Sequence, residues 1–411
     1  MTKREFDVVL YGASGFTGKQ TVIDFKLHAP SSMKWAIAGR SKERLEAVLR
    51  DLGLSSDRVP ILVADSQDLD ELEKLAARTH VILSTAGPFS LYAPKLIQAC
   101  VQQSTHWCDI TGETPFIRQM IDIHHAEARE KGLKIVPACG FDSVPSDIGT
   151  LWAIHEVMKK TGRKSAEVRS FFTVKGGLNG GTLASARLIA DRAEFKKVAH
   201  IFLLDPENTP HSDEEFRANA DLRKPQYISA LGKWAAPFFM AAINTRIVRR
   251  SVALFRENTE AELLGYSTQF RYNEMMIISE PFGFPLVTWM TTLGLAVFDG
   301  LIRTQFGGKL LDRVGPAPGV GPSEKAMNDG FSRTLYLVKD DTGQTHRFEM
   351  IDQGDPGNRI TVRIVCECAR LLAEESQLLP GQGGVLTPAT AFGLKLVERL
   401  RARGTIFQAL P

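Results

Sequence analysis

Residues 6–18 read FDVVLYGASGFTG, an apolar run that ends in a glycine-rich turn and then enters a helix-like stretch. In this arrangement the diphosphate of a dinucleotide lies on a helix N-terminus, because the backbone amides there point toward negative charge. Gly12 permits the tight turn, and Gly15 lets the backbone approach the phosphates. An ordinary glycine turn is the alternative. The residues expected at the diphosphate are Gly12, Ser14, Gly15, Phe16, Thr17 and Gly18.

Short β-rich runs alternate with longer, charge-flanked stretches over residues 6–138. This alternation predicts a parallel sheet with helices on both faces, which is a Rossmann domain, over residues 1–145. The expected strands are residues 6–11, 34–38, 59–64, 80–84, 106–110 and 133–137. The expected helices are residues 17–27, 41–52, 68–77, 93–102 and 115–131.

The end of the second predicted strand indicates which dinucleotide binds. Enzymes that use NAD usually carry an acid there for the ribose hydroxyls, whereas this chain has Ala38-Gly39-Arg40-Ser41. The Arg40 guanidinium can pair with a 2′-phosphate, and Ser41 can bond the same phosphate at a helix start. A surface arginine that only opens a helix is the alternative. The sequence therefore predicts NADP(H).

Three further loops follow predicted strands, so they are expected at the carboxyl edge, where open α/β sheets bind ligands. Asp65 could touch the adenine, or it could equally be a capping residue. The turn Ala86-Gly87-Pro88 could border the nicotinamide ribose, or it could be a plain tight turn. Cys139 and Gly140 follow the sixth strand and are also expected to face the cofactor.

After Pro145 the strand–helix rhythm is lost, and the pattern becomes that of an α+β domain over residues 146–384. We expect a helix over residues 147–160, a strand over residues 167–175, and two or three antiparallel strands within residues 330–366, broken at 340–344 and 354–358. Residues 389–403 have the spacing of one amphipathic helix within a final segment, residues 385–411.

The chain resembles the saccharopine dehydrogenase-like oxidoreductases, a family that includes the mycobacterial trans-acting enoyl reductases, in the ordered motifs GASGFTG, AGRS, STAGPFSLYAPKLIQAC, HWCDITGE and PACGFDSVPSDIG. Later stretches similar to that family are KGGLNGGTLAS, GVGPSE, GDPG and GGVLTPATAFG. The resemblance implies an α/β fold: an N-terminal Rossmann domain with a doubly wound parallel sheet, a second α+β domain carrying dimer and substrate surfaces, and a C-terminal helix that returns to the first domain.

Hydride transfer needs a group that neutralises developing negative charge beside the nicotinamide. Asp142 and Ser143 follow the sixth strand and could orient a water or the substrate. Asp109 and Glu113 follow the fifth strand and either do the same or only hold the turn. Lys175 precedes a glycine-rich run and could offer a cation to a carbonyl or thioester, or this run could be a hinge.

Composition excludes several classes of protein. The 50 Lys and Arg residues are matched by 47 Asp and Glu and are scattered, so no nucleic acid is expected as a partner. The nine histidines lack metal-ligand spacing, so no metal is expected. Five cysteines without a CxxC pair, and an N-terminus without a secretion signal, predict a cytoplasmic protein, either free or peripheral to a membrane or lipid surface.

Residues 281–298 form an apolar stretch without a charge. It is short for spanning a membrane and is interrupted by Pro and Gly, so a buried core helix or a membrane-facing or acyl-binding element is expected. A second apolar run, residues 234–243, precedes Arg246, Arg249 and Arg250, which could meet anionic headgroups.

Together these features predict an NADP(H)-dependent reductase of an unsaturated or carbonyl-bearing acyl or lipid substrate. The family resemblance also implies that the protein could form a homodimer. A non-catalytic lipid-surface protein that keeps the cofactor fold is the alternative, because no general acid is obvious. A saccharopine-type amino-acid dehydrogenase is disfavoured, because the chain has no evident cluster of arginines for substrate carboxylates.

Overall fold

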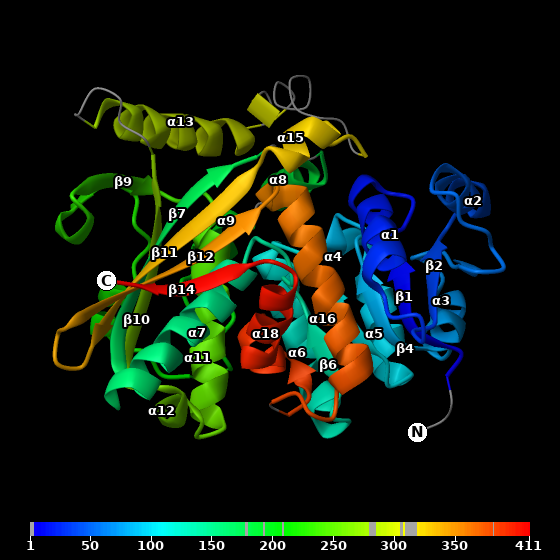
Figure 1. The fold of residues 1–411 in the computed structure, drawn as a ribbon, viewed down its shortest axis with the longest axis horizontal. Helices are drawn as coiled ribbons and strands as arrows, with labels where there is room; N and C mark the ends of the chain where they lie inside the picture. Colours follow the sequence, from blue (N-terminus) through cyan, green and yellow to red (C-terminus); the bar gives the residue numbers. More distant parts are fainter. Residues whose placement is uncertain are drawn as a thin grey trace.

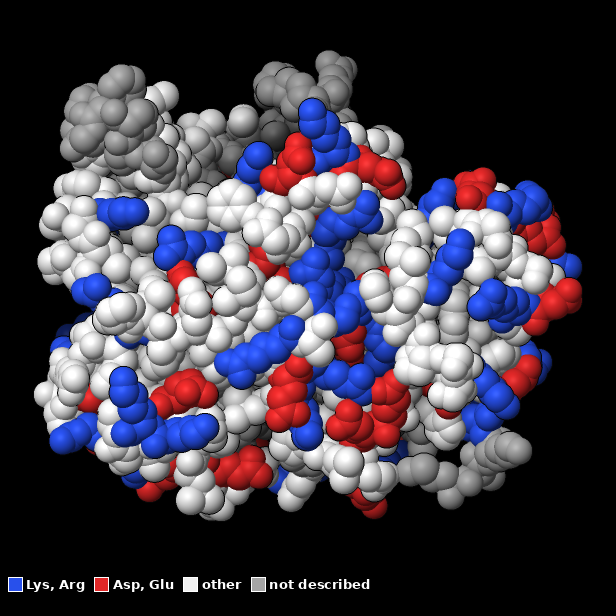
Figure 2. Space-filling model, in the orientation of Figure 1, with Lys and Arg blue, Asp and Glu red and all other residues white. Residues whose placement is uncertain are grey.

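The computed structural model describes residues 4–176, 180–191, 194–207, 209–278, 285–304, 307–308, 319–380 and 382–411. Two seven-stranded sheets lie next to each other (Figure 1), the first built mainly from the N-terminal third of the chain and the second from the rest. Lys and Arg side chains mix with Asp and Glu over the face shown in Figure 2, as the scattered charges of the sequence predict.

The first sheet is parallel throughout, in the order β13-β6-β5-β4-β1-β2-β3. Its strands are β1 (Phe6–Tyr11), β2 (Trp35–Gly39), β3 (Ile61–Val63), β4 (Thr79–Ser84), β5 (His106–Asp109), β6 (Lys134–Val136) and β13 (Gly384–Val385). Its helices are α1 (Phe16–His28), α2 (Lys42–Asp51), α3 (Leu69–Ala76), α4 (Phe89–Tyr92), α5 (Pro94–Gln102) and α6 (Thr114–Glu130). The six predicted strands and five predicted helices are confirmed to within two residues at each end.

The second sheet is mixed, in the order β14-β12-β11-β7-β10-β9-β8, with β7 and β10 parallel and the other neighbours antiparallel. Its strands are β7 (Ser165–Lys175), β8 (Gln226–Ile228), β9 (Lys233–Pro237), β10 (Tyr266–Ile277), β11 (Phe331–Asp340), β12 (Thr345–Gln353) and β14 (Ile406–Leu410). The predicted α/β fold with a second α+β domain is thus confirmed.

Helices and single turns connect these strands. They are α7 (Val144–Thr161), α8 (Gly180–Asp191), α9 (Phe195–Ala199), α10 (Asp213–Ala218), η1 (Ser229–Leu231), α11 (Ala241–Glu257), α12 (Ala261–Leu264), α13 (Leu286–Ile302), α15 (Glu324–Asn328) and the π-helical turn η2 (Pro356–Ile360), followed by α16 (Thr361–Glu375), α17 (Pro388–Phe392) and α18 (Leu394–Ala402). Among the described residues, none of these helices combines the length and the apolar character needed to cross a lipid bilayer.

The prediction of two or three antiparallel strands within residues 330–366 is confirmed for two, β11 and β12. A third strand does not form, because the chain forms helix α16 there. The run TVRIVCECAR is rich in β-branched residues, but its apolar side chains also recur at helical spacing. Val362, Val365, Cys366 and Ala369 are buried in the core shared with the first sheet. In Figure 1, α16 runs beside α1, which it contacts.

The predicted helix over residues 389–403 is in fact two helices, because Gly393 has φ +54° and ψ −148°, which no helix accommodates. The C-terminal segment serves both domains. Strand β13 pairs with β6 at the edge of the first sheet, and β14 pairs with β12 at the edge of the second. The domain boundaries at residues 145 and 384 remain predictions.

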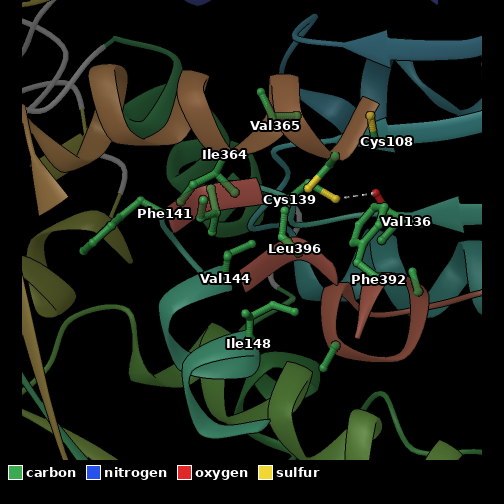
Figure 3. Packing of buried hydrophobic residues seen from close by; sticks show 14 of the residues in the cluster. Cys108, Val136, Cys139, Phe141, Val144, Ile148, Ile364, Val365, Phe392 and Leu396 are labelled. Carbon is green, nitrogen blue, oxygen red and sulfur yellow. Dashed lines mark hydrogen bonds between the residues drawn. The ribbon is translucent and has the colours of Figure 1, made fainter. Parts of the chain in front are cut away.

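Helices α7, α16, α17 and α18 enclose a core on one face of the first sheet (Figure 3), and Cys139 lies in its centre. The labelled residues around Cys139 are Cys108, Val136, Phe141, Val144, Ile148, Ile364, Val365, Phe392 and Leu396. Each fully buried aliphatic or aromatic side chain stabilises the fold by about 1.5–3 kcal/mol. Side chains from the C-terminal helices therefore help to hold the first domain.

Arg246, Arg249 and Arg250 do not face a membrane, contrary to one expectation from the sequence. All three are buried on α11, and their guanidinium groups bind segments 198–204 and 219–221. Arg246 pairs with Asp221, while Arg249 donates to the carbonyls of Ile201 and Asn219. A guanidinium has five donors in a fixed fork, which suits it to this use as an internal brace.

Candidate functional site at the carboxyl edge of the first sheet

The glycine turn after β1 has no room for side chains at two of its positions. A Cβ on Gly12, whose φ is +83°, would stand 2.9 Å from the amide nitrogen of Ala86, and one on Gly18 would stand 2.1 Å from the Gly12 carbonyl oxygen. Helix α1 starts at Phe16, and no side chain caps its first turn at Gly15. Ser14 and Gly15 are exposed, so this turn leaves backbone donors open to a ligand.

Arg40 and Ser41 lie where β2 ends and α2 begins. Arg40 is exposed, and within the described ranges no hydrogen bond or ion pair engages its guanidinium. Ser41 is the N-cap of α2, and its Oγ accepts from the Arg44 amide at 3.3 Å. Asp65 accepts from the Gln67 amide at 2.9 Å, so it stabilises its own turn, while Asp68 caps α3.

The loop after β4 contains a cis peptide between Gly87 and Pro88 and is fixed by a buried carboxylate. Glu113 accepts from the backbone amides of Phe89 at 2.8 Å and Ser90 at 3.1 Å, at the start of α4. Ala86, against which Gly12 packs, lies in the same loop. The loop and the glycine turn are therefore built against each other.

Asp109 has a structural part in this edge. Its carboxylate accepts from the Trp107 indole at 2.8 Å and from the backbone amides of Thr111 and Ala138. Burial raises the pKa of Asp109 to about 7, although these hydrogen bonds favour the charged form. Asp109 and Glu113 were expected either to orient a water or the substrate or only to hold the turn. Their contacts favour the second role.

The loop after β6 leads into α7. The Cys139 thiol points into the core (Figure 3) and donates toward the Val136 carbonyl, so only its backbone could face a cofactor. A Cβ on Gly140 would stand 3.1 Å from the Thr361 side chain, whose Oγ1 accepts from the Phe141 amide. The start of α16 therefore supports this loop from the second half of the chain.

Asp142 differs from the other acids of this edge. Its side chain is half-buried, and among the described residues no group donates a hydrogen bond to its carboxylate. Burial alone raises the pKa of Asp142 to about 6. A carboxyl group with a raised pKa and no protein partner is suited to exchange a proton with a ligand.

Ser143, which was expected to orient a water or the substrate, is fully buried beneath the loop. Its Oγ lies 3.3 Å from Asn244 Oδ1, and Asn244 Nδ2 donates to Glu274 Oε1 at 2.8 Å. The hydroxyls of Ser146 and Tyr272 both donate to Glu274 Oε2 at 2.7 Å. The Ser143 hydroxyl is therefore part of a buried hydrogen-bonded cluster and is not exposed to a ligand.

Glu274 is the functional candidate that sequence reasoning missed. Burial raises its pKa to about 7 against the hydrogen bonds from its three partners. One signal was present: residues 270, 272 and 274 alternate along β10, so the two-residue period places Glu274 on the same buried face as Phe270 and Tyr272. An acid at an inward position needs partners, which Asn244, Ser146 and Tyr272 provide.

Lys175 ends β7 and is exposed, and residues 177–179 of the following glycine run lie outside the described residues. The next position, Gly176, packs against the η2 turn, because a Cβ there would stand 2.6 Å from Pro356. Segment 319–323 reaches the first domain, where a Cβ on Gly321 would stand 2.2 Å from the Phe16 ring. Second-domain segments thus lie against the start of α1.

These residues fit a dinucleotide with a 2′-phosphate. The uncapped start of α1 offers amides to the diphosphate, and the exposed Arg40 offers a cation at the end of β2. The individual contacts of the predicted cofactor residues stay predictions. Within the described ranges, no group of three or more His, Cys, Asp and Glu side chains is placed to hold a metal ion.

Comparison with known proteins agrees with this geometry. Residues 8–136 match the family described as the saccharopine dehydrogenase NADP binding domain, and the cofactor is accordingly NADP(H). The solved structure of apo saccharopine dehydrogenase (L-Glu forming) from Saccharomyces cerevisiae has the same fold, with a TM-score of 0.55 and 13% identity over 98% of this chain and 99% of that one.

Several mycobacterial proteins are similar over their whole length. The trans-acting enoyl reductases of Mycobacterium tuberculosis H37Rv and Mycobacterium leprae are each 34% identical to this chain, covering 98% of it and 97% of the relative. A further Mycobacterium tuberculosis protein, named provisionally for the same activity, is 37% identical, covering 99% of this chain and 98% of that protein.

Proposed function

Because this chain belongs to the trans-acting enoyl reductase family of saccharopine dehydrogenase-like proteins, we propose that it reduces the carbon–carbon double bond of an unsaturated acyl or lipid substrate with NADPH. The oxidoreductase class follows from the family and its NADP-binding domain.

Asp142 is the observation that carries the proposed chemistry. When bound, NADPH supplies a hydride to one carbon of the double bond, and the other carbon must then receive a proton. Asp142 follows β6 at the edge where we expect the cofactor, and its raised pKa keeps it partly protonated near neutrality. It is therefore suited to give that proton, and water can restore it.

The surrounding residues would orient the reactants. Arg40 would hold the 2′-phosphate end, which distinguishes NADPH from NADH. Glu113 keeps the 86–90 loop in place by binding two of its amides. Lys175 would stand at the second-domain side and offer its ammonium group to the thioester carbonyl, whose oxygen becomes more negative as the hydride arrives.

The experiment is an NADPH-oxidation assay with two substrate arms. A set of 2-enoyl thioesters of increasing chain length tests the proposal, and a 2-keto acid with an amino acid tests the saccharopine-type alternative. We expect oxidation with enoyl thioesters only, and saturated product by mass spectrometry. NADPH binding without oxidation in any arm would instead favour the non-catalytic protein, and turnover only with the keto acid would favour the amino-acid dehydrogenase.

A further inference from the structure

Helix α13 carries its large apolar side chains on the outside of the molecule. It crosses one end of the second sheet (Figure 1), where it contacts β9 and α8. Residues 279–284 lie outside the described residues, so only residues 285–298 of the predicted apolar stretch can be placed. The outward side chains, with their exposed fractions, are Leu286 42%, Trp289 52%, Met290 63%, Leu293 66%, Val297 53% and Phe298 39%.

The inward face of α13 is less apolar than the outward one. Thr288 and Ile302 are its two buried residues, and the half-buried ones are Val287, Thr291, Thr292, Leu295 and Leu301, so three threonines interrupt the inward apolar side chains. A surface helix of a protein surrounded by water has the opposite pattern, with its apolar stripe against the core and polar residues outside. The prediction of a buried core helix is therefore wrong for α13, and its outer face is suited to an apolar partner.

The size of this face argues against a second copy of the chain as that partner. The six outward side chains expose roughly 600 Å² together, so two copies would bury about 1,200 Å², the lower limit of a stable interface and well below an obligate homodimer. A single helix lying in the plane of a lipid surface needs no larger area, because its apolar face enters the headgroup–acyl boundary by itself.

The charges of α13 point to the kind of lipid surface. Asp299 is the only charged residue between Leu286 and Ile302, and it pairs with Arg303 at 2.9 Å. The helix therefore brings no net cation to anionic headgroups, and binding must come from apolar side chains. One of these side chains is Trp289, and tryptophan is enriched at membrane–water interfaces.

We propose that α13 docks this protein onto a lipid surface by inserting Trp289, Met290 and Leu293, independently of anionic lipids. The proposal goes beyond the reductase function and does not depend on it. It adds a way for a reductase of acyl or lipid substrates to work where such substrates gather.

Flotation of the full-length protein with phosphatidylcholine vesicles tests the proposal. We expect the wild type to float with the vesicles at low and high salt alike, with the fluorescence of Trp289 shifted to the blue. A double variant, Met290→Lys with Leu293→Lys, should bind at least about tenfold more weakly, because a lysine is costly below the headgroups. The matched control, Leu27→Lys with Leu263→Lys, changes two exposed leucines outside α13 and should bind like the wild type.

Three results would overturn the proposal. The wild type could stay with the unbound protein, or the control pair could lose as much binding as the α13 pair. Sedimentation could also show a lipid-free dimer that the α13 pair converts to a monomer, in which case a second copy covers the face. NADPH oxidation with a short, water-soluble enoyl thioester is measured in parallel, because the α13 pair should leave it unchanged whether or not the reductase function holds.

Discussion

Ser185 Oγ on α8 donates a 2.8 Å hydrogen bond to Glu113 Oε1, and this bond connects the second domain to the loop that follows β5. The same carboxylate binds the amides of Phe89 and Ser90. Gly12 packs against Ala86, which lies in the same loop after β4 as Phe89 and Ser90. One buried acid therefore links the glycine turn, the loop after β4 and the second domain.

Replacing Glu113 should therefore disturb both stability and cofactor binding. Glu113→Ala leaves two backbone donors without their partner, which costs about 1–3 kcal/mol for each buried group. We expect a lower free energy of unfolding in urea and a weaker NADPH affinity by fluorescence titration. Ser185→Ala is the control, because it removes only the contact to α8. If Ser185→Ala weakened NADPH binding as much as Glu113→Ala, the effect of Glu113 would not come from its support of the 86–90 loop.

Arg40 should decide between the two nicotinamide dinucleotides. A charge-assisted hydrogen bond is worth about 1.5–3 kcal/mol, so Arg40→Ala should raise the Kd for NADPH roughly tenfold to a hundredfold and leave that for NADH nearly unchanged. Calorimetry with both dinucleotides measures the ratio. Arg44→Ala, which removes an exposed arginine one helical turn further on, should keep it. An unchanged ratio in Arg40→Ala would remove Arg40 from the site.

The first domain could be predicted from its sequence because each of its signals is local. Every strand from β1 to β5 is followed within a few residues by its crossover helix, and the glycine turn lies directly between β1 and α1. The carboxyl edge then follows from topology alone, since parallel strands all end on the same side. For this reason the sequence alone predicts that the loops at residues 86–88 and 139–143 lie at one edge of the sheet.

The remaining features depend on contacts between distant residues. Strand β13 is two residues long and pairs with β6 about 250 residues earlier, so no local pattern marks it. In α16, the β-branched residues suggested a strand, but burial against the first sheet favoured a helix. Arg250 was expected at a surface, and only the fold shows the Leu204 and Val385 carbonyls that it binds.

Glu274 should make the stability of the protein depend on pH. Its pKa rises from 4.5 in the unfolded chain to about 7 in the fold, so between these values the folded state holds a proton that the unfolded state has lost. Stability therefore falls as pH rises from 4.5 to 7, by about 1.4 kcal/mol per pH unit from this group, and levels off above it.

Urea unfolding of Glu274→Gln at several pH values between 5 and 7 checks this contribution. The variant keeps an acceptor for Asn244 but cannot ionise. Its free energy of unfolding should therefore fall less steeply with pH, by the contribution of one proton, about 1.4 kcal/mol per pH unit. The slope that remains belongs to other buried acids, such as Asp147, whose pKa burial raises to about 7. Equal slopes in the variant and the wild type would mean that Glu274 does not titrate in this range.

Asp142 should control the pH dependence of the proposed reduction. If its protonated form gives the proton to the substrate carbon, kcat/KM with an enoyl thioester should fall as pH rises through about 6. Asp142→Asn should lower kcat by about 10²–10⁴-fold, the usual contribution of a general acid, and flatten the profile. NADPH affinity should stay within about twofold of the wild type, because nothing in this role requires the carboxylate to hold the dinucleotide.

Two further variants separate chemistry from support. Ser143→Ala removes a hydroxyl beneath the same loop, so we expect a smaller loss of kcat and a profile that still falls near pH 6. Asp57→Asn changes an exposed acid of the first domain and should behave like the wild type.

A full pH dependence in Asp142→Asn would show that the proton comes from elsewhere. The exposed Lys175 ammonium or a water would then be the donor to test, since the other acids of this edge are bound to backbone amides.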